Sequence, residues 1–177
     1  MGLTMLGLTG ARFSVVCADV LPGDAQLISR QVATSGPDLR VPKLAFYLKS
    51  HNSPLAPYAA TFVKEADKNG LDWRLLAAIS GVESTFGQAI PSSSYNAWGW
   101  GVFTGMSYGI YFKDWQDGIT RVSKGLKTNY LDKGAESVEE IGRIYAASPA
   151  WSRKVRFFIN QIDNFIASRP ELIEVNL

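Results

Sequence analysis

The stretch Leu75–Gly101, LLAAISGVESTFGQAIPSSSYNAWGWG, decides how the rest of this chain is interpreted. It begins as an apolar segment, reaches one carboxylate at Glu83, and continues as a polar loop. It ends in a run of aromatic residues and glycines. The pattern predicts a buried helix that carries one acid near its end and faces an aromatic wall.

The first half of the stretch has helical spacing. Its apolar residues recur every three or four positions and form one stripe: Leu75, Ile79, Val82 and Phe86. Asp72 is the predicted N-cap of this helix. Gly87 is the predicted residue after its C-terminus, because glycine readily takes the left-handed conformation found there. Glu83 is therefore predicted to lie in the last turn.

The last turn of a helix is an unfavourable place for an anion. The helix C-terminus carries partial negative charge, and the apolar stripe beside Glu83 adds a cost of desolvation. Both effects should raise the pKa of Glu83, as a general acid at neutral pH requires. The alternative interpretation is a solvated surface glutamate.

The segment after this helix favours a loop rather than a regular element. Gln88–Tyr95 contains a proline and little apolar content, and Asn96–Tyr111 is dense in glycine and aromatic residues, so a short β-hairpin is an alternative there. Flat aromatic rings can hold the apolar face of a sugar. The candidates for this role are Trp98, Trp100, Phe103, Tyr108 and Tyr111. Their alternative role is packing in the core.

Two motifs in this stretch resemble a known family. Glu83-Ser84-Thr85-Phe86-Gly87 resembles the Glu-Ser-x-Phe-Gly signature of the lysozyme-like superfamily, in the branch of lytic transglycosylases and bacterial endo-β-N-acetylglucosaminidases. Tyr95-Asn96-Ala97-Trp98-Gly99-Trp100-Gly101 resembles the segment that lines the glycan cleft in that branch. The resemblance extends from about Ser53 to the mid-130s, with a weaker match around Tyr145.

The resemblance implies a mostly α, lysozyme-like helical domain in which a Gly/aromatic-rich loop or short β-hairpin lines a cleft. It implies cleavage of a β-1,4 bond between amino sugars of peptidoglycan, with Glu83 as general acid and base and Tyr145 close to it. Tyr145 lacks the usual Tyr-Asn-x-Gly context, so a core tyrosine is the alternative. The residues expected to bind substrate are Ser84, Tyr95, Asn96, Trp98 and Trp100. Ser84 is also expected to orient either Glu83 or its loop by a hydrogen bond.

Composition limits the class of protein. A chain of 177 residues with 46% hydrophobic and 19% charged residues fits one globular domain. A net charge of +2 suits an anionic polymer such as a cell wall and is too small to indicate nucleic acid. The single cysteine, Cys17, and the single histidine, His51, exclude an intrachain disulfide and a multi-histidine metal site. We therefore expect a monomer that holds no metal and no cofactor. We expect His51 to lie in a surface loop, and the alternative is a position near the cleft.

The N-terminus predicts an exported protein. Residues 1–23 are interpreted as a signal or leader segment, because Val16-Cys17-Ala18 resembles a small-residue cleavage site. A lipoprotein site at Cys17 fits less well, because Val16 is bulky where such a site has a small residue. The segment is marginal as a membrane helix, and an unstructured start is the other alternative. Residues 24–52 are interpreted as an N-terminal extension with a short helix after Pro42, and residues 53–177 as the glycan-cleaving domain.

The remaining helices of this domain are predicted from their ends. One should begin at Ser53-Pro54 and stop at Asn69-Gly70. Asp114 should cap the next, with Asp117 in its first turn rather than as a second catalytic carboxylate. Ser137 and Glu140 form a predicted capping box. The last helix should run from Ser148-Pro149 to Arg169-Pro170, with Ile166 among its buried residues.

Two other classes of protein fit the same pattern. One is a non-catalytic module that binds or anchors to cell-wall glycan; it would have no use for a desolvated carboxylate at a helix C-terminus. The other is a structural assembly protein, for instance of a secretion apparatus or a phage particle, in which wall cleavage is secondary.

Overall fold

The protein is mostly α-helical, as the sequence predicts. The computed structural model describes residues 38–101, 109–146 and 148–166, and within them it has helices and no strand. The α-helices are α1 (Arg40–Ser50), α2 (Ala59–Asn69), α3 (Leu75–Ser84), α4 (Trp115–Asn129), α5 (Val138–Tyr145) and α6 (Trp151–Asp163). Two short 3-10 helices, η1 (Ala56–Tyr58) and η2 (Leu131–Lys133), precede α2 and follow α4.

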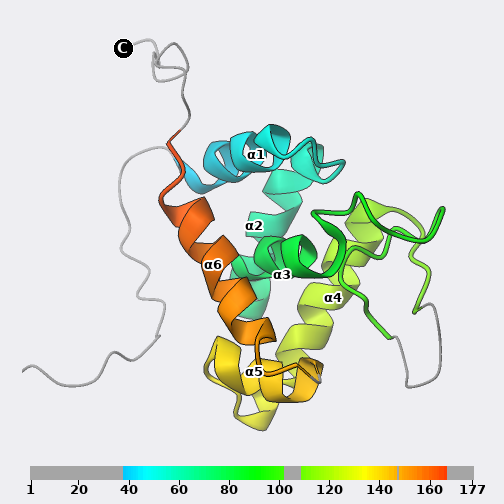
Figure 1. Ribbon diagram of the computed structural model, residues 1–177, viewed down its shortest axis with the longest axis vertical. Coiled ribbons are helices and arrows are strands. Elements are labelled where there is room, and N and C mark those ends of the chain that lie inside the picture. Colours follow the sequence, from blue (N-terminus) through cyan, green and yellow to red (C-terminus); the bar gives the residue numbers. More distant parts are fainter. Residues whose placement is uncertain (1–37, 102–108, 147, 167–177) are drawn as a thin grey trace, which may run out of the picture.

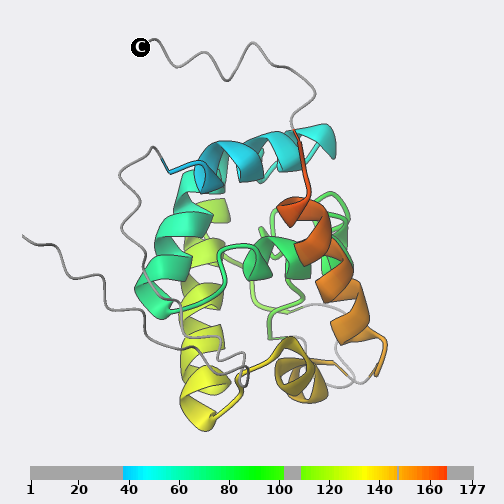
Figure 2. The same ribbon diagram turned by 90° about the vertical axis from the view of Figure 1, so that its left-hand side faces the viewer.

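Helix α3 lies in the middle of the molecule. Figures 1 and 2 show it between α6 on one side and α2 and α4 on the other. Every side chain from Leu75 to Ser80 is buried, so the helix is apolar nearly all round its first two turns. Burial of this segment positions the more open C-terminal end of α3, where Glu83 lies.

Helix α1 shares the core of the other helices. Leu44, Tyr47 and Leu48 are buried in the same cluster as the apolar residues of α2 and α3. Arg40 also pairs with Asp67 of α2 at 2.7 Å. The helix predicted after Pro42 is thus present, and it packs against the helices that follow residue 53.

The second predicted helix begins later than expected. Its end at Gly70, which has φ +65°, is confirmed, but the α-helix starts at Ala59 and not at Ser53-Pro54. The Ser53 hydroxyl accepts the Leu55 N–H at 3.1 Å and donates to the Phe86 carbonyl at 2.8 Å. Ser53 therefore caps a turn that is fixed to the end of α3, and η1 intervenes before α2.

The predicted starts of α4 and α5 are confirmed, whereas α6 starts at Trp151, after the predicted Ser148-Pro149. Asp114 accepts the Asp117 N–H at 2.8 Å and caps α4, while Ser137 and Glu140 form the capping box of α5. Helix α6, however, ends at Asp163. Ile166 is 82% exposed, so its predicted burial is wrong. No helix in the described ranges is both long and apolar enough to cross a membrane.

Candidate functional site

The C-terminus of α3 is an unusual turn that places Glu83 in the last turn of the helix, as predicted. Thr85, Phe86 and Gly87 all have positive φ, of 51°, 57° and 84°. The predicted role of Gly87 as the first left-handed residue is wrong, because Thr85 already takes that conformation. A Cβ on Gly81 would lie 2.7 Å from the Phe86 ring. After the reversal, the Phe86 ring therefore packs directly against the helix that precedes it.

Ser84 fixes the end of α3 to the loop that follows. Its hydroxyl contacts the Ala97 carbonyl at 2.7 Å and accepts the Gly87 N–H at 2.9 Å. It also lies 3.1 Å from the Ser80 carbonyl, within hydrogen-bond reach. These bonds orient the loop, which is one of the two roles predicted for Ser84; its partners are backbone groups of the turn and loop rather than Glu83.

Glu83 has a different neighbour on each carboxylate oxygen. Oε1 accepts the indole N–H of Trp151 at 2.6 Å. Oε2 faces Gly99, where an added Cβ would lie 3.3 Å from it. Part of the Glu83 side chain is exposed to solvent, and the part that its neighbours cover loses hydration, which raises its pKa. The hydrogen bond from Trp151 and the positive charge of Lys154 oppose this rise. The predicted direction of the pKa is confirmed, with burial as the main cause.

Tyr145 and Trp151 form a stacked pair beside Glu83. Their ring centroids are 4.8 Å apart and the rings are inclined by 23°. The Tyr145 hydroxyl donates to the Trp98 carbonyl at 2.6 Å. Burial, and then the negative charge of Glu83, raise the pKa of Tyr145 well above its usual range. Tyr145 is thus close enough to sense Glu83, and it stays protonated at neutral pH.

A small pocket lies beside Glu83. Its volume is about 110 Å³, and Glu83 is the one carboxylate among the described residues that line it. The lining, which we call the Glu83 pocket, consists of Glu83, Ser84, Ala89, Pro91, Ser94, Asn96, Gly99, Gly109, Ile110 and Tyr111. Residues from the end of α3 and from the glycine-rich loop therefore meet at this pocket.

Two predicted substrate-binding residues have structural roles instead. The Trp98 ring is 0% exposed, and its indole donates to the Leu76 carbonyl at 3.0 Å, so it cannot form a sugar platform. The Asn96 amide donates to the Trp100 and Ile110 carbonyls, both at 2.9 Å. Both N–H groups of Asn96 thus hold the loop together and neither is free for an N-acetyl group.

The other predicted aromatic residues are distributed over several surroundings. Tyr95 is half-buried and packs edge-on against Trp115. Trp100 is half-buried between α4 and Tyr145. Tyr111 is 52% exposed and is the aromatic ring among the described residues that line the Glu83 pocket. Phe103 and Tyr108 lie outside the described residues.

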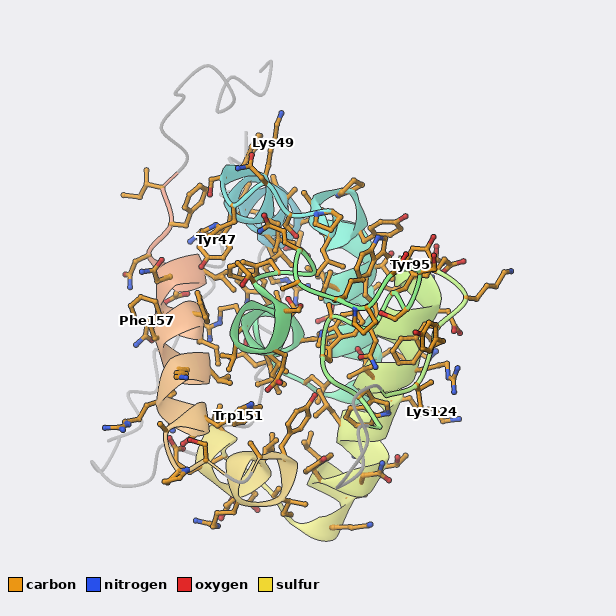
Figure 3. The ribbon with its side chains drawn as sticks, turned by 45° about the vertical axis from the view of Figure 1, so that its right-hand side comes forward. Tyr47, Lys49, Tyr95, Lys124, Trp151 and Phe157 are labelled. Atoms are coloured by element: carbon orange, nitrogen blue, oxygen red, sulfur yellow. The ribbon has the colours of Figure 1, made fainter. Side chains whose placement is uncertain are left out.

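Trp151 is the residue that sequence analysis missed. It begins α6, is 4% exposed, and contacts both Glu83 and Tyr145. Figure 3 places it at the end of α6 that adjoins α5. The sequence offers one signal for this residue, namely that a tryptophan follows soon after Ser148-Pro149. The local sequence does not show that this tryptophan reaches Glu83.

A second and wider pocket lies between α1 and α6. Its volume is about 540 Å³, and Tyr47, His51, Phe157 and Phe165 are among its lining residues. Figure 3 shows Phe157 farther along α6 than Trp151, and Tyr47, which belongs to α1, lies toward the same end of the molecule as Phe157. His51 is half-buried, and it lines this pocket rather than the Glu83 pocket.

Comparison with known proteins adds no family assignment. No protein-family model matches the sequence, and no curated protein matches it significantly. In the described part of the chain, no three His, Cys, Asp or Glu side chains are grouped so that they could hold a metal ion.

Proposed function

We propose that this protein is a lysozyme-like enzyme that cleaves a β-1,4 bond between amino sugars in peptidoglycan. The observation that carries the proposal is the setting of Glu83. It lies in the last turn of a buried helix, one oxygen accepts an indole N–H, and the other faces a glycine at the edge of a pocket. Partial burial raises the pKa of Glu83, which favours the protonated form that a general acid needs.

The proposed reaction begins with proton transfer from Glu83 to the glycosidic oxygen. The bond to the anomeric carbon breaks and leaves an oxocarbenium-like centre. The Glu83 carboxylate then acts as a base. It takes the proton either from the sugar's own 6-hydroxyl, which gives an anhydro product, or from an attacking water. A pocket whose described lining has one carboxylate fits the first scheme.

Substrate would be held by the loop that follows α3. Tyr111 offers an exposed ring at the pocket, and the glycines beside it allow the backbone to approach a sugar closely. Lys154, whose positive charge acts on Glu83, would favour an anionic glycan strand. We propose that the protein acts as an exported monomer, in the periplasm, the cell envelope or outside the cell, because the polymer lies there.

The proposal is tested by release of soluble fragments from purified peptidoglycan sacculi. The wild type should release fragments, and Glu83→Gln should release them at least about a hundredfold more slowly. Glu136→Gln serves as a matched control, because Glu136 is an exposed glutamate far along the sequence at the start of α5. Co-sedimentation with sacculi should be equal for all three proteins. Co-sedimentation without fragments from any of them would favour the alternative, a non-catalytic wall-binding module.

A further inference from the structure

The Trp151 indole is held rigidly against Glu83. Its ring is stacked on Tyr145. It also packs closely against Gly142 of α5, where an added Cβ would lie 3.0 Å from the indole. Tyr145 is fixed in turn by its hydrogen bond to the Trp98 carbonyl. The indole therefore has little freedom to turn away, and its N–H stays directed at Oε1 of Glu83 at 2.6 Å.

An indole N–H can donate a hydrogen bond but cannot accept one. A protonated carboxyl group has one hydroxyl oxygen and one carbonyl oxygen, and the carbonyl oxygen is the better acceptor. If the proton were on Oε1, two donors, the Glu83 hydroxyl and the Trp151 N–H, would face each other, and the hydrogen bond would be weakened. A proton on Oε2 leaves the hydrogen bond intact and faces Gly99 at the Glu83 pocket.

We infer that Trp151 is a positioning residue that keeps Oε1 of Glu83 as the acceptor and so places the transferable proton on Oε2. This inference rests on the proposed function, in which Glu83 is the general acid. It specifies where the scissile bond must lie: the glycosidic oxygen approaches Oε2 from the Gly99 side of the pocket. No local feature of the sequence around Glu83 specifies that direction.

Two side chains stabilise the charge of Glu83, and they allow a sharp test. They are Trp151 and Lys154, both on α6, whereas the Tyr145 phenol on α5 is itself acted on by the Glu83 charge. Replacing Trp151 by Phe keeps an aromatic ring on Tyr145 and removes the donor. The pKa of Glu83 should then rise further, because the carboxylate loses a hydrogen bond.

The first measurement is a carboxyl ¹³C NMR titration of Glu83, assigned by the signal that Glu83→Gln lacks. The Glu83 pKa should be higher in Trp151→Phe than in the wild type and unchanged in Trp73→Phe, a matched control at the other end of α3. On peptidoglycan, kcat of Trp151→Phe should fall by about tenfold with little change in KM. An unchanged Glu83 pKa in folded Trp151→Phe would overturn the inference.

The second measurement needs no variant of Trp151. The indole N–H resonance of the wild type should stay at a hydrogen-bonded position on both sides of the Glu83 titration, because protonation of Oε2 preserves the bond. A shift to the position of a free indole N–H when Glu83 is protonated would place the proton on Oε1 and refute the inference. Both NMR results are obtained even if the protein cleaves no glycan, so failure of the proposed function is distinguishable.

Discussion

Two glutamates at opposite kinds of helix end have opposite chemistry. Glu140 lies in the first turn of α5 and accepts the N–H groups of Glu136 and Ser137 at 2.7 and 3.0 Å, which lowers its pKa. Glu83 lies in the last turn of α3, where its protein donor is the indole of Trp151, and its pKa is raised. The first arrangement stabilises a helix. The second opposes the helix dipole, which suggests a use other than stability.

The largest expected difference between the two sites is in activity. Glu83→Gln should lower the rate of peptidoglycan cleavage by about 10² to 10⁴-fold, the usual contribution of a general acid, whereas Glu140→Gln should leave kcat unchanged. Glutamine keeps the shape of Glu83 and removes its proton. Fragment release measured at equal protein concentration checks this, and substantial turnover by Glu83→Gln would remove the residue from the mechanism.

Two glycines with positive φ sharpen the comparison. Gly99 (φ +59°) faces Oε2 of Glu83, whereas Gly134 (φ +91°) precedes α5 and an added Cβ there would meet nothing within 4 Å. Alanine at either position should cost about 1–2 kcal/mol of stability through backbone strain. Only Gly99→Ala should also lower kcat, because its methyl group crowds the acid. Denaturant unfolding and initial rates separate the effects; equal kcat for both variants would contradict this role of Gly99.

The serines at the two helix ends should differ in stability. Ser84→Ala leaves the Ala97 carbonyl and the Gly87 N–H without their buried partner, which should cost about 1–3 kcal/mol. Ser137→Ala removes one N-cap and should cost about 1 kcal/mol. Urea unfolding monitored by circular dichroism gives both values. A smaller loss for Ser84→Ala than for Ser137→Ala would mean that the end of α3 is not held by this hydroxyl.

The smallest effect is the pH dependence of stability, and its sign differs between the sites. Native Glu83 binds its proton more tightly than the unfolded chain does, so the free energy of unfolding falls as pH rises above the ordinary glutamate pKa of about 4.3. Native Glu140 binds its proton less tightly, so its contribution is lost as pH falls below that value. The free energy of unfolding of Glu83→Gln should therefore increase relative to that of the wild type as pH rises from 4 to 7.

The measurement for this prediction is urea unfolding of both variants and the wild type between pH 3 and pH 7. The free energy of unfolding of Glu140→Gln should decrease relative to that of the wild type over the same rise in pH, because this variant lacks the carboxylate that the capping box favours. A parallel pH dependence of the two variants would show that the helix ends do not differ in the way described.

Local features were predictable from the sequence. The caps at Asp114 and Ser137 and the apolar face of α3 depend on residues within one or two turns, so their patterns suffice. The reversal at Thr85 was missed, and the Phe86 ring beside it packs against Tyr47 of α1 and Phe158 of α6, which are distant in the sequence. Aromatic composition in the loop could not tell a buried ring, Trp98, from an exposed one, Tyr111.

The electrostatic setting of the candidate acid was predictable only in part. The position of Glu83 near the end of an apolar helix predicted the direction of its pKa. Its partner Trp151 lies 68 residues later in the chain, so no local periodicity connects the two. The partner emerges only when α6 packs beside α3, and that packing is a property of the whole fold.

The central claim is that Glu83 is the acid that cleaves peptidoglycan. Mass spectrometry of soluble products from purified peptidoglycan, with the wild type and Glu83→Gln side by side, tests it most directly. The account predicts new muropeptides from the wild type alone, with 1,6-anhydro ends if the single-carboxylate scheme operates and reducing ends if water attacks. Equal products from both proteins, or none from either while both remain folded, would contradict the claim.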